Sequence, residues 1–469
     1  MTEIEAGRRV IVAGAGPTGL WLAAELALND VPVLVLEAAP RRGTRSKALT
    51  IHPRTVEVLA SRDAHRPFLD EGVRIPTGHF GALESRLDFS VLDTPFPFTL
   101  ALPQVRTEEL LEARAVALGA EIRRGARVSG FAQDGDGVVV HVDGSADERG
   151  SHLVGCDGAG SAVRAAAGID FPGTDATTWG FLGDVRLDSP PREPVGTVTE
   201  RGNLLVVPLG GGLHRLVGVT PEHVGTDRPG RLTEEEFRRT VERIAGHDVG
   251  MGAPVWLSRF GDATRQAARY RLGRVLLAGD AAHVHFPAGG VGLNLGVQDA
   301  ANLGWKLAAV VRGEAPDVLL DTYHDERHPV GAAVLRSSLA QTALITSFSA
   351  QGRALRDVLS TLVVTRPEVS RDLAEQLSAL GVAYRAPDDA HPLVGTRAPD
   401  LPVGGSGLFA LLRPGRHVLL DFAGNAELPV PARTLVHSAR APRDRLEWDG
   451  VAAALIRPDG HVASISASR

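Results

Sequence analysis

The chain has 469 residues, of which 43% are hydrophobic and 23% charged, and its formal net charge is −6. From this length we expect two or three domains. The sequence contains no run of about 18 apolar residues that could cross a membrane, and its polar N-terminus does not resemble a signal peptide, so we expect a globular cytoplasmic protein. Nucleic acid is excluded as an expected partner by the lack of a basic block. The single cysteine, Cys156, excludes internal disulfides and paired-cysteine redox or zinc sites, so we expect no metal.

The first predicted unit is a strand, a glycine-rich turn and a helix, followed by a second strand. Apolar and β-branched residues predict a buried strand over 8–13, and the run Gly14-Ala15-Gly16-Pro17-Thr18-Gly19 follows it directly. An Ala- and Leu-rich helix is predicted over 20–28, with the proline of the run in its entry turn. The second strand, over 31–36, ends in Glu37.

This arrangement is typical of a dinucleotide site. Gly14 permits the tight turn, Gly16 lets the backbone approach a pyrophosphate, and Gly19 lets the helix pack against the strand. The pyrophosphate would lie on the helix N-terminus, and Glu37 would accept hydrogen bonds from the ribose hydroxyls. An acid at that position argues against a 2′-phosphate, so the unit favours FAD or NAD over NADP. The alternative is a glycine turn that binds no ligand.

A second glycine-bearing region begins with a strand predicted over 274–278. Gly279-Asp280-Ala281-Ala282-His283 closes that strand, and Phe286-Pro287-Ala288-Gly289-Gly290-Val291-Gly292-Leu293-Asn294 follows. A long amphipathic helix then passes through 298–306, and its positive end points toward the glycines because it begins near Gly292. The two histidines at 283 and 285 have no evident metal-ligand partner, so a structural role is favoured for both.

Together these runs resemble the para-hydroxybenzoate-hydroxylase-like (group A) flavoprotein monooxygenases, especially the aromatic polyketide hydroxylases. That family carries a G-D-A-A-H stretch, a proline with a G-G-x-G-[LM]-N run, and a D-A-x-N-L-x-W-K-L helix. It also carries a D-G motif, matched here by Cys156-Asp157-Gly158. The chain departs from the family at Phe286-Pro287, where Pro-Pro is common, and at Ala288 and Val291. These departures weaken any specific substrate assignment.

The resemblance implies an α/β fold in which a Rossmann-like FAD-binding domain is interrupted by an inserted mixed β-sheet substrate domain. A helical segment and a thioredoxin-like C-terminal α/β domain follow, and the latter contains no cysteine, so it serves as structure or as a contact surface. The predicted boundaries are 1–76, 104–174 and 270–335 for the FAD-binding domain, 77–103 and 175–269 for the substrate domain, 336–386 for the helical segment, and 391–469 for the C-terminal domain.

The resemblance also assigns residues to FAD. Asp280 would bind the ribityl hydroxyls, Arg45 would face the flavin, Gln104 would lie over the ribityl chain, and the backbone of Val128 would meet the adenine. For Arg45 and Gln104, a solvated arginine and a helix-entry glutamine are the alternatives. The full set is Gly14, Gly16, Pro17, Thr18, Gly19, Glu37, Ala38, Arg45, Gln104, Val128, Asp157, Asp280, Pro287, Gly290, Gly292, Leu293 and Asn294.

Alternating apolar residues predict a sheet in the substrate domain. The segments 204–209 and 214–219, joined by three glycines, predict a hairpin. A sheet over the mouth of the flavin site would line a substrate pocket, although plain sheet core is the alternative for each side chain. The candidate pocket residues are Phe89, Phe96, Trp179, Phe181, Leu204 and Val206.

The activity implied by the resemblance is that of an FAD-dependent, NAD(P)H- and O2-consuming monooxygenase that hydroxylates a polycyclic aromatic, polyketide-type substrate. Oxygen would pass through a C4a-hydroperoxide of the flavin, so the cofactor performs the difficult step and no catalytic side chain is named. No second strand–GxGxxG–helix unit is evident, so NAD(P)H would visit the flavin transiently. Baeyer–Villiger or antibiotic-inactivating oxygenation stays open, as does a non-catalytic flavoprotein that sequesters an aromatic ligand. A homodimer is compatible with the sequence.

Overall fold

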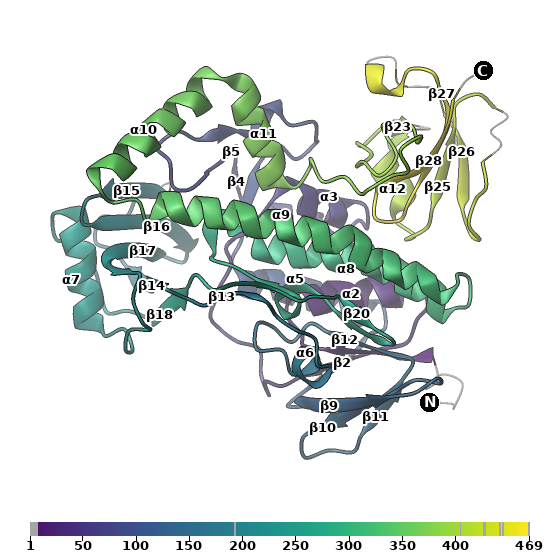
Figure 1. Cartoon of the computed structure of the whole chain (residues 1–469), viewed down its shortest axis with the longest axis horizontal. Helices are drawn as coiled ribbons and strands as arrows, with labels where there is room; N and C mark the ends of the chain where they lie inside the picture. Colours follow the sequence, from purple (N-terminus) through teal and green to yellow (C-terminus); the bar gives the residue numbers. More distant parts are fainter. Residues whose placement is uncertain are drawn as a thin grey trace.

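The structure is a computed structural model that describes residues 8–191, 194–403, 405–424, 428–439, 442 and 445–467. Figure 1 shows a broad body crossed by two long helices, α8 (Gly292–Val311) and α9 (Asp321–Ile345), with a smaller C-terminal unit at the upper right. This is the mixed α/β architecture that the sequence predicts. In the described part of the chain, no helix is long and apolar enough to span a membrane.

A six-stranded sheet lies in the lower part of the body. Its order is β20-β21-β12-β1-β2-β8, and every neighbouring pair is parallel except β20 with β21. All of β1 is buried, which explains why this strand is a continuous apolar run rather than an alternating one. The strands are β1 (Val10–Ala13), β2 (Val33–Glu37), β8 (Glu121–Arg124), β12 (His152–Gly155), β20 (Arg271–Leu272) and β21 (Val275–Leu277).

Helix α2 (Pro17–Leu28) connects β1 to β2 and packs against α5 (Gln104–Ala117) and α8. As the sequence predicts, Pro17 lies in the first turn of this helix, which continues to Leu28. Proline has no N–H and a suitable φ angle, so it fits the first position of a helix without loss of a hydrogen bond. A small antiparallel sheet, made of β9 (Val128–Gln133), β10 (Val138–Val142) and β11 (Glu148–Gly150), lies at the bottom of the molecule in Figure 1.

A second large sheet has five antiparallel strands in the order β15-β16-β17-β14-β18. Strands β16 and β17 form the predicted hairpin. Helix α7 (Glu234–Ala245) covers one face of this sheet through its apolar residues Phe237, Val241 and Ile244. The strands are β14 (Thr178–Arg186), β15 (Val195–Thr199), β16 (Gly202–Gly210), β17 (Leu213–Val224) and β18 (Trp256–Gly261).

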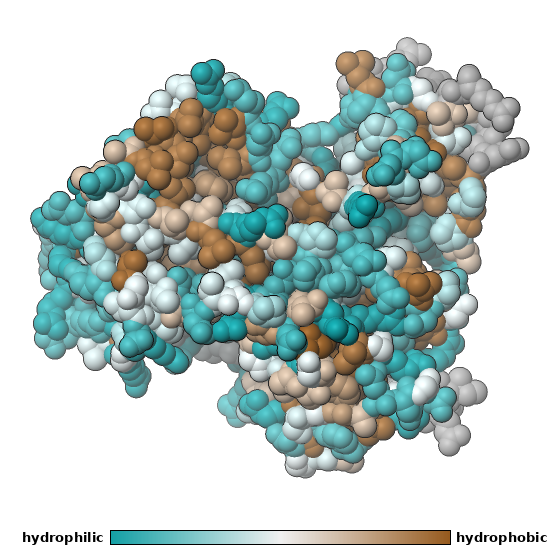
Figure 2. Space-filling view, in the orientation of Figure 1, coloured by the Kyte–Doolittle hydropathy of each residue, from teal (hydrophilic) through white to brown (hydrophobic). Residues whose placement is uncertain are grey.

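Two further helices, α10 (Ala350–Thr365) and α11 (Pro367–Ser378), follow α9. Their inner sides share a core with the segment around Leu87 and Phe89. The outer side of α10 is apolar, and Figure 2 shows it as a brown patch at the upper left. Its exposed large residues are Leu355, Val358, Leu362 and Val364.

The C-terminal unit is built on a four-stranded mixed sheet in the order β26-β25-β27-β28. Its core also includes Ala60 from α3 (Pro53–Ala60), so the unit is packed against the body. A tight turn at 457–461 joins its last two strands. The strands are β25 (Val418–Asp421), β26 (Leu435–Ser438), β27 (Val451–Ile456) and β28 (Val462–Ala467).

Candidate functional site

The motifs meet at one edge of the six-stranded sheet. Strands β21, β12, β1 and β2 are parallel neighbours, and the runs that begin at Ala278, Cys156 and Gly14 follow three of them, with Glu37 ending the fourth. The carboxyl edge of such a sheet is where open α/β folds bind their ligands. The fold therefore brings together three motifs that begin at residues 14, 156 and 279 of the sequence.

Glycine is required in this edge because backbones and side chains approach too closely for a Cβ atom. A Cβ on Gly14, where φ is +102°, would lie 2.4 Å from the carbonyl oxygen of Cys156. A Cβ on Gly19 would lie 2.1 Å from the carbonyl oxygen of Gly14. Thr18 fills the space beside the second region, since its Oγ1 would be 2.5 Å from a Cβ on Gly279. These contacts join all three motifs.

The entry to α2 fits the diphosphate of a dinucleotide. No side chain caps this helix, so its first N–H groups are available to an anion. A Cβ on Gly16 would meet nothing within 4 Å, so this glycine faces open space. Gly14 is therefore required by the protein's own packing, whereas Gly16 leaves room for a ligand.

Glu37 lies at the end of this cradle where the sequence predicts the adenosine. Its two carboxylate oxygens accept hydrogen bonds from the backbone N–H groups of Ala15 and Ala39, each at 2.8 Å. Each oxygen has a further lone pair, so the predicted ribose contact stays open. The N–H of Ala126 donates to the carbonyl of Glu37 at 2.9 Å, which brings the loop before Val128 beside Glu37 and the half-buried Ala38. The residues expected at ribose and adenine therefore share one end of the edge.

The two aspartates of the motifs have different surroundings. Asp280 is exposed on a short 3-10 turn, Gly279–Ala281. Asp157 is half-buried and accepts from Ser161 Oγ at 2.5 Å and from the N–H of Val163 at 3.2 Å, at the start of α6 (Ala162–Ala166). Asp280 therefore has a free carboxylate to offer the cofactor, whereas Asp157 holds its own loop.

The loop before α8 is fixed from behind by Asn294 and His52. The side-chain amide of Asn294 donates to the carbonyls of Gly290, at 2.9 Å, and Thr50, at 3.1 Å, and its oxygen accepts from the N–H of His52. His52 Nε2 lies 2.8 Å from the carbonyl oxygen of Gly289, and burial lowers the pKa of His52 to about 4. Sequence analysis did not identify His52, since a histidine before a proline carries no distinctive signal.

The same loop leads into the unprotected end of α8. The helix begins at Gly292 without a side-chain cap, so its first N–H groups point out of the helix beside Leu293 and the loop that follows Pro287. Fixed donors and the positive end of a helix dipole stabilise negative charge. This end of the site therefore fits the pyrimidine edge of a reduced flavin.

Gln104 begins α5 and contacts the segment that carries Arg45. Gln104 Oε1 accepts from the N–H of Ala48 at 2.9 Å, and its amide donates to Glu108 Oε1 at 2.7 Å. Burial raises the pKa of the Glu108 carboxyl. Arg45 is exposed. Gln104 thus anchors the chain next to Arg45, and its own contact with a cofactor stays a prediction.

The candidate pocket residues lie in several separate places. Phe181 meets Phe237 of α7 with ring centroids 6.0 Å apart, and Leu204 and Val206 pack into the same cluster. Phe89 is buried beneath α10 and α11, and Phe96 packs edge-on against His65. Trp179 donates from Nε1 to the carbonyl of Thr226 at 3.3 Å. The structure does not bring these six together, and it places three of them on the α7 side of the sheet.

The opposite face of the five-stranded sheet contacts two loops of the predicted cofactor site, which we call the cofactor loops: the one that carries Lys47 and the one that carries Phe286 and Pro287. Side chains alternate along a strand, so Asp184 and Gly180 lie on the face away from Phe181. Arg215 pairs with Asp184 at 2.8 Å and donates to the carbonyl of Lys47 at 3.0 Å. Phe260, paired across from Gly180, lies 5.2 Å from the ring centroid of Phe286, immediately before Pro287.

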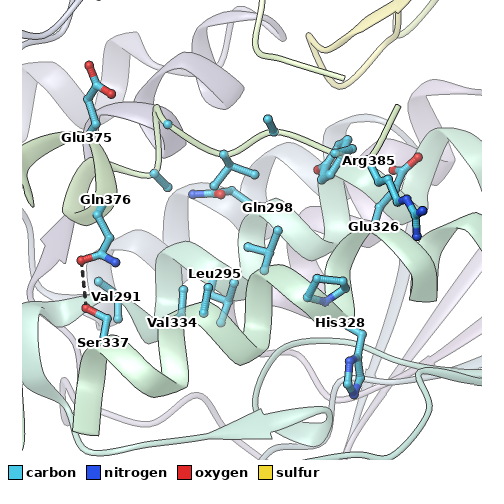
Figure 3. Close-up of a pocket in the computed structure, with 18 of the residues that line it drawn as sticks. Val291, Leu295, Gln298, Glu326, His328, Val334, Ser337, Glu375, Gln376 and Arg385 are labelled. Atoms are coloured by element: carbon cyan, nitrogen blue, oxygen red, sulfur yellow. Dashed lines mark hydrogen bonds between the residues drawn. The ribbon is translucent and has the colours of Figure 1, made fainter. Parts of the chain in front are cut away.

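A separate groove of about 1330 Å³ lies between α8, α9 and α11. Figure 3 shows Leu295 and Gln298 on one side, Val334 and Ser337 on another, and the hydrogen bond between Ser337 and Gln376. None of the described residues of the five-stranded sheet lines this groove. It therefore lies apart from the sheet face that meets the cofactor loops.

Comparison with known proteins identifies matching families and relatives over nearly the whole chain. A family model described as an FAD binding domain matches residues 8–338, and one described as the C-terminal domain of aromatic-ring hydroxylases matches residues 391–469. An uncharacterized aromatic compound monooxygenase of Bacillus subtilis is 47% identical, over 97% of this chain and 93% of its own length.

Two relatives from Streptomyces have named activities. A 12-dehydrotetracycline 5-monooxygenase/anhydrotetracycline 6-monooxygenase of Streptomyces rimosus is 43% identical, and a rifampicin monooxygenase of Streptomyces venezuelae is 44% identical, each over 97% of this chain and 94% of the relative.

Two solved structures superpose closely. The anhydrotetracycline hydroxylase OxyS from Streptomyces rimosus has a TM-score of 0.89 at 42% identity, and a Diels-Alderase of pyrroindomycin biosynthesis has 0.86 at 37% identity. Each comparison covers 98% of this chain and 96% of the other.

Proposed function

This chain belongs to the FAD-dependent aromatic-ring hydroxylases, and on that premise we propose that it hydroxylates a polycyclic, polyketide-type aromatic compound at the expense of NAD(P)H and O2. It is a flavoprotein monooxygenase, and its cofactor is FAD. The substrate class is the new element, and the wall of the five-stranded sheet opposite α7 supports it.

This wall is aromatic and partly exposed. Trp256 and Phe260 are half-buried, and Phe260 reaches Phe286 because Gly180 opposite it has no side chain. A Cβ on Gly180 would lie 2.2 Å from the Phe260 ring. The buried Arg215–Asp184 pair holds the wall beside the segment that carries Arg45. A flat, extended aromatic compound suits such a surface, since aromatic rings stack or pack edge-on with one another.

The protein's part in the reaction is to bind, orient and exclude water. Bound FAD supplies, when reduced, the oxygen-transfer chemistry. Backbone N–H groups of the loop around Gly290 and the start of α8 stabilise negative charge on the cofactor's pyrimidine edge. Asp280 would hold the cofactor by accepting hydrogen bonds from its ribityl hydroxyls. The aromatic wall keeps water from the reacting atoms.

Aerobic NADPH oxidation by the FAD-loaded protein tests the proposal, with a panel of angucycline, anthraquinone and naphthacene compounds. We expect one compound to stimulate oxidation and to yield a product heavier by one oxygen. Compounds that bind without stimulating NADPH oxidation would contradict the hydroxylase and favour a sequestering flavoprotein.

A second candidate is oxygenation that inactivates an antibiotic, which the 44% identity to a rifampicin monooxygenase favours. Loss of antibacterial activity in the oxygenated product would identify it. A product of unchanged mass would instead indicate ring closure without oxygen transfer, the kind of reaction named for the Diels-Alderase.

A further inference from the structure

The turn between β27 and β28 inserts charged side chains of the C-terminal unit into the body. Arg457 donates to both carboxylate oxygens of Glu326 on α9, at 2.7 and 2.8 Å. Asp459 accepts from Trp305 Nε1 on α8 at 3.3 Å, and its backbone carbonyl accepts from Arg54 on α3 at 2.7 Å. One turn therefore holds three helices of the FAD-binding region.

Tyr384 connects this turn to the interior. The ring of His461 lies 4.2 Å from the Tyr384 ring, and the Arg457 guanidinium lies 5.0 Å from it. The Tyr384 hydroxyl accepts from Arg327 NH1 at 3.4 Å. A movement of the turn would displace this ring and release one side of the Arg327 guanidinium.

Arg327 in turn holds Asp299, and Asp299 holds the turn that carries Asp280. Arg327 Nε donates to Asp299 Oδ1 at 2.8 Å. The other oxygen, Oδ2, lies 2.7 Å from His283 Nε2 and accepts from the N–H of Gly279 at 3.2 Å. A single carboxylate thus fastens both ends of the segment 279–283.

The Asp299–Arg327 pair at the centre of this series of contacts is buried, and each of its charges depends on the other. The side chains of Asp299 and Arg327 are 0% and 1% exposed. Burial alone would raise the pKa of Asp299, but Arg327 and His283 outweigh it and hold the pKa below its ordinary value. Loss or displacement of one partner leaves the other charge buried without compensation, so the surrounding turn must rearrange.

We propose that the C-terminal unit is a positioning element of the FAD site: its 457–461 turn acts through Tyr384, Arg327 and Asp299 to fix the turn that carries Asp280. The affinity for FAD and the reduction potential of bound FAD both depend on this contact. The unit therefore contributes to cofactor binding without a residue that touches the cofactor.

A second arginine of the same unit supplies a matched control. Arg445 donates to both carboxylate oxygens of Asp93, at 2.6 and 2.8 Å, so it also anchors the C-terminal unit to the body. Asp93 makes no described hydrogen bond to the 457–461 turn, Tyr384, Arg327 or Asp299. Arg457→Gln and Arg445→Gln each remove one guanidinium between the same two parts of the molecule.

The experiment measures, for both variants of the FAD-loaded protein, the FAD dissociation constant, the reduction potential of the bound flavin and the thermal midpoint. We expect Arg457→Gln to raise the dissociation constant about tenfold, the factor expected for a hydrogen bond to a charged group, and to shift the potential. Arg445→Gln should lower the thermal midpoint and leave both cofactor readouts unchanged.

Equal changes in both variants, or an unchanged dissociation constant and potential in Arg457→Gln, would overturn the proposal and leave the unit as an anchor. If Arg457→Gln does not fold, Tyr384→Phe decides, because it removes only the hydroxyl that meets Arg327. Weaker FAD binding with a shifted potential in that variant supports the positioning role, and wild-type values for both would contradict it.

Discussion

The cofactor edge of the six-stranded sheet and the aromatic wall of the five-stranded sheet meet around one site but are held by different means. At the edge, backbone atoms approach so closely that a Cβ on Gly14 or Gly19 would overlap a carbonyl group. At the wall, the two sides differ only in which side chains point toward α7 and which point away. The edge therefore tolerates almost no change, whereas the wall can change its substrate-facing residues without loss of the fold.

The largest expected effect is at the edge. Gly14→Ala places a Cβ 2.4 Å from a backbone carbonyl at a φ of +102°, so we expect a loss of more than about 4 kcal/mol of unfolding free energy and no FAD in the purified protein. Gly16→Ala is the control, because open space surrounds its Cβ: the apoprotein should keep its thermal midpoint while FAD affinity falls. Equal stabilities for the two apoproteins would contradict the conclusion that packing requires Gly14 but not Gly16.

The wall provides the next test, since its two faces should respond in opposite ways. Phe181→Ala removes a buried ring from the core under α7, and we expect it to cost about 3 to 4 kcal/mol of stability with an unchanged KM for the aromatic substrate. Phe260→Ala, on the other face, should raise that KM about tenfold, the value of a lost aromatic contact. A raised KM in Phe181→Ala, measured where the variant is fully folded, would restore Phe181 as a pocket residue.

The same contrast explains what sequence analysis could and could not predict. Close backbone approach demands glycine, so the cofactor edge leaves a residue-type signature at Gly14, Gly19 and Gly279 that can be recognised without a structure. The wall has no such signature. The alternating pattern of a strand separates its two faces, but it does not show which face is covered by a helix. The amphipathic segment 234–245 was the available signal: its stripe at Phe237, Val241 and Ile244 requires one face of the sheet, and Phe181 lies there.

The long-range polar contacts could not be predicted from the sequence for a different reason. Asp299 lies in a recognised motif, but its partner Arg327 is on another helix, and nothing in the spacing indicates that pair or the insertion of Arg457 from beyond residue 450. His52 likewise depends on a carbonyl 237 positions away. Such contacts follow from how helices cross and not from local patterns.

His52 gives a pH-dependent test of the edge. Its pKa in the folded protein is about 4, below the ordinary 6.5, so the unfolded chain binds more protons between these values. The part of the unfolding free energy that depends on a neutral His52 is complete above pH 6.5 and is lost as the pH falls toward 4. About 2 kcal/mol of it is lost between pH 7 and 5. His52→Gln keeps a donor for Gly289 but does not titrate, so its unfolding free energy should fall less over that interval. Parallel pH curves for the two proteins in urea titrations would contradict the assignment.

The smallest effect separates the two aspartates of the cofactor edge, and it tests whether aspartates from two different motifs have the same role. Asp157 accepts from Ser161 and from the N–H of Val163, so Asp157→Asn should cost about 1 kcal/mol of stability through its helix entry while FAD affinity stays near that of the wild type. Asp280 is exposed and makes no such contact, so Asp280→Asn should leave the thermal midpoint of the apoprotein unchanged and weaken FAD binding. Fluorescence titration of both apoproteins with FAD measures the difference. The opposite ranking would mean that Asp157 contacts FAD through the lone pairs that its two hydrogen bonds leave open, and that Asp280 does not bind the cofactor.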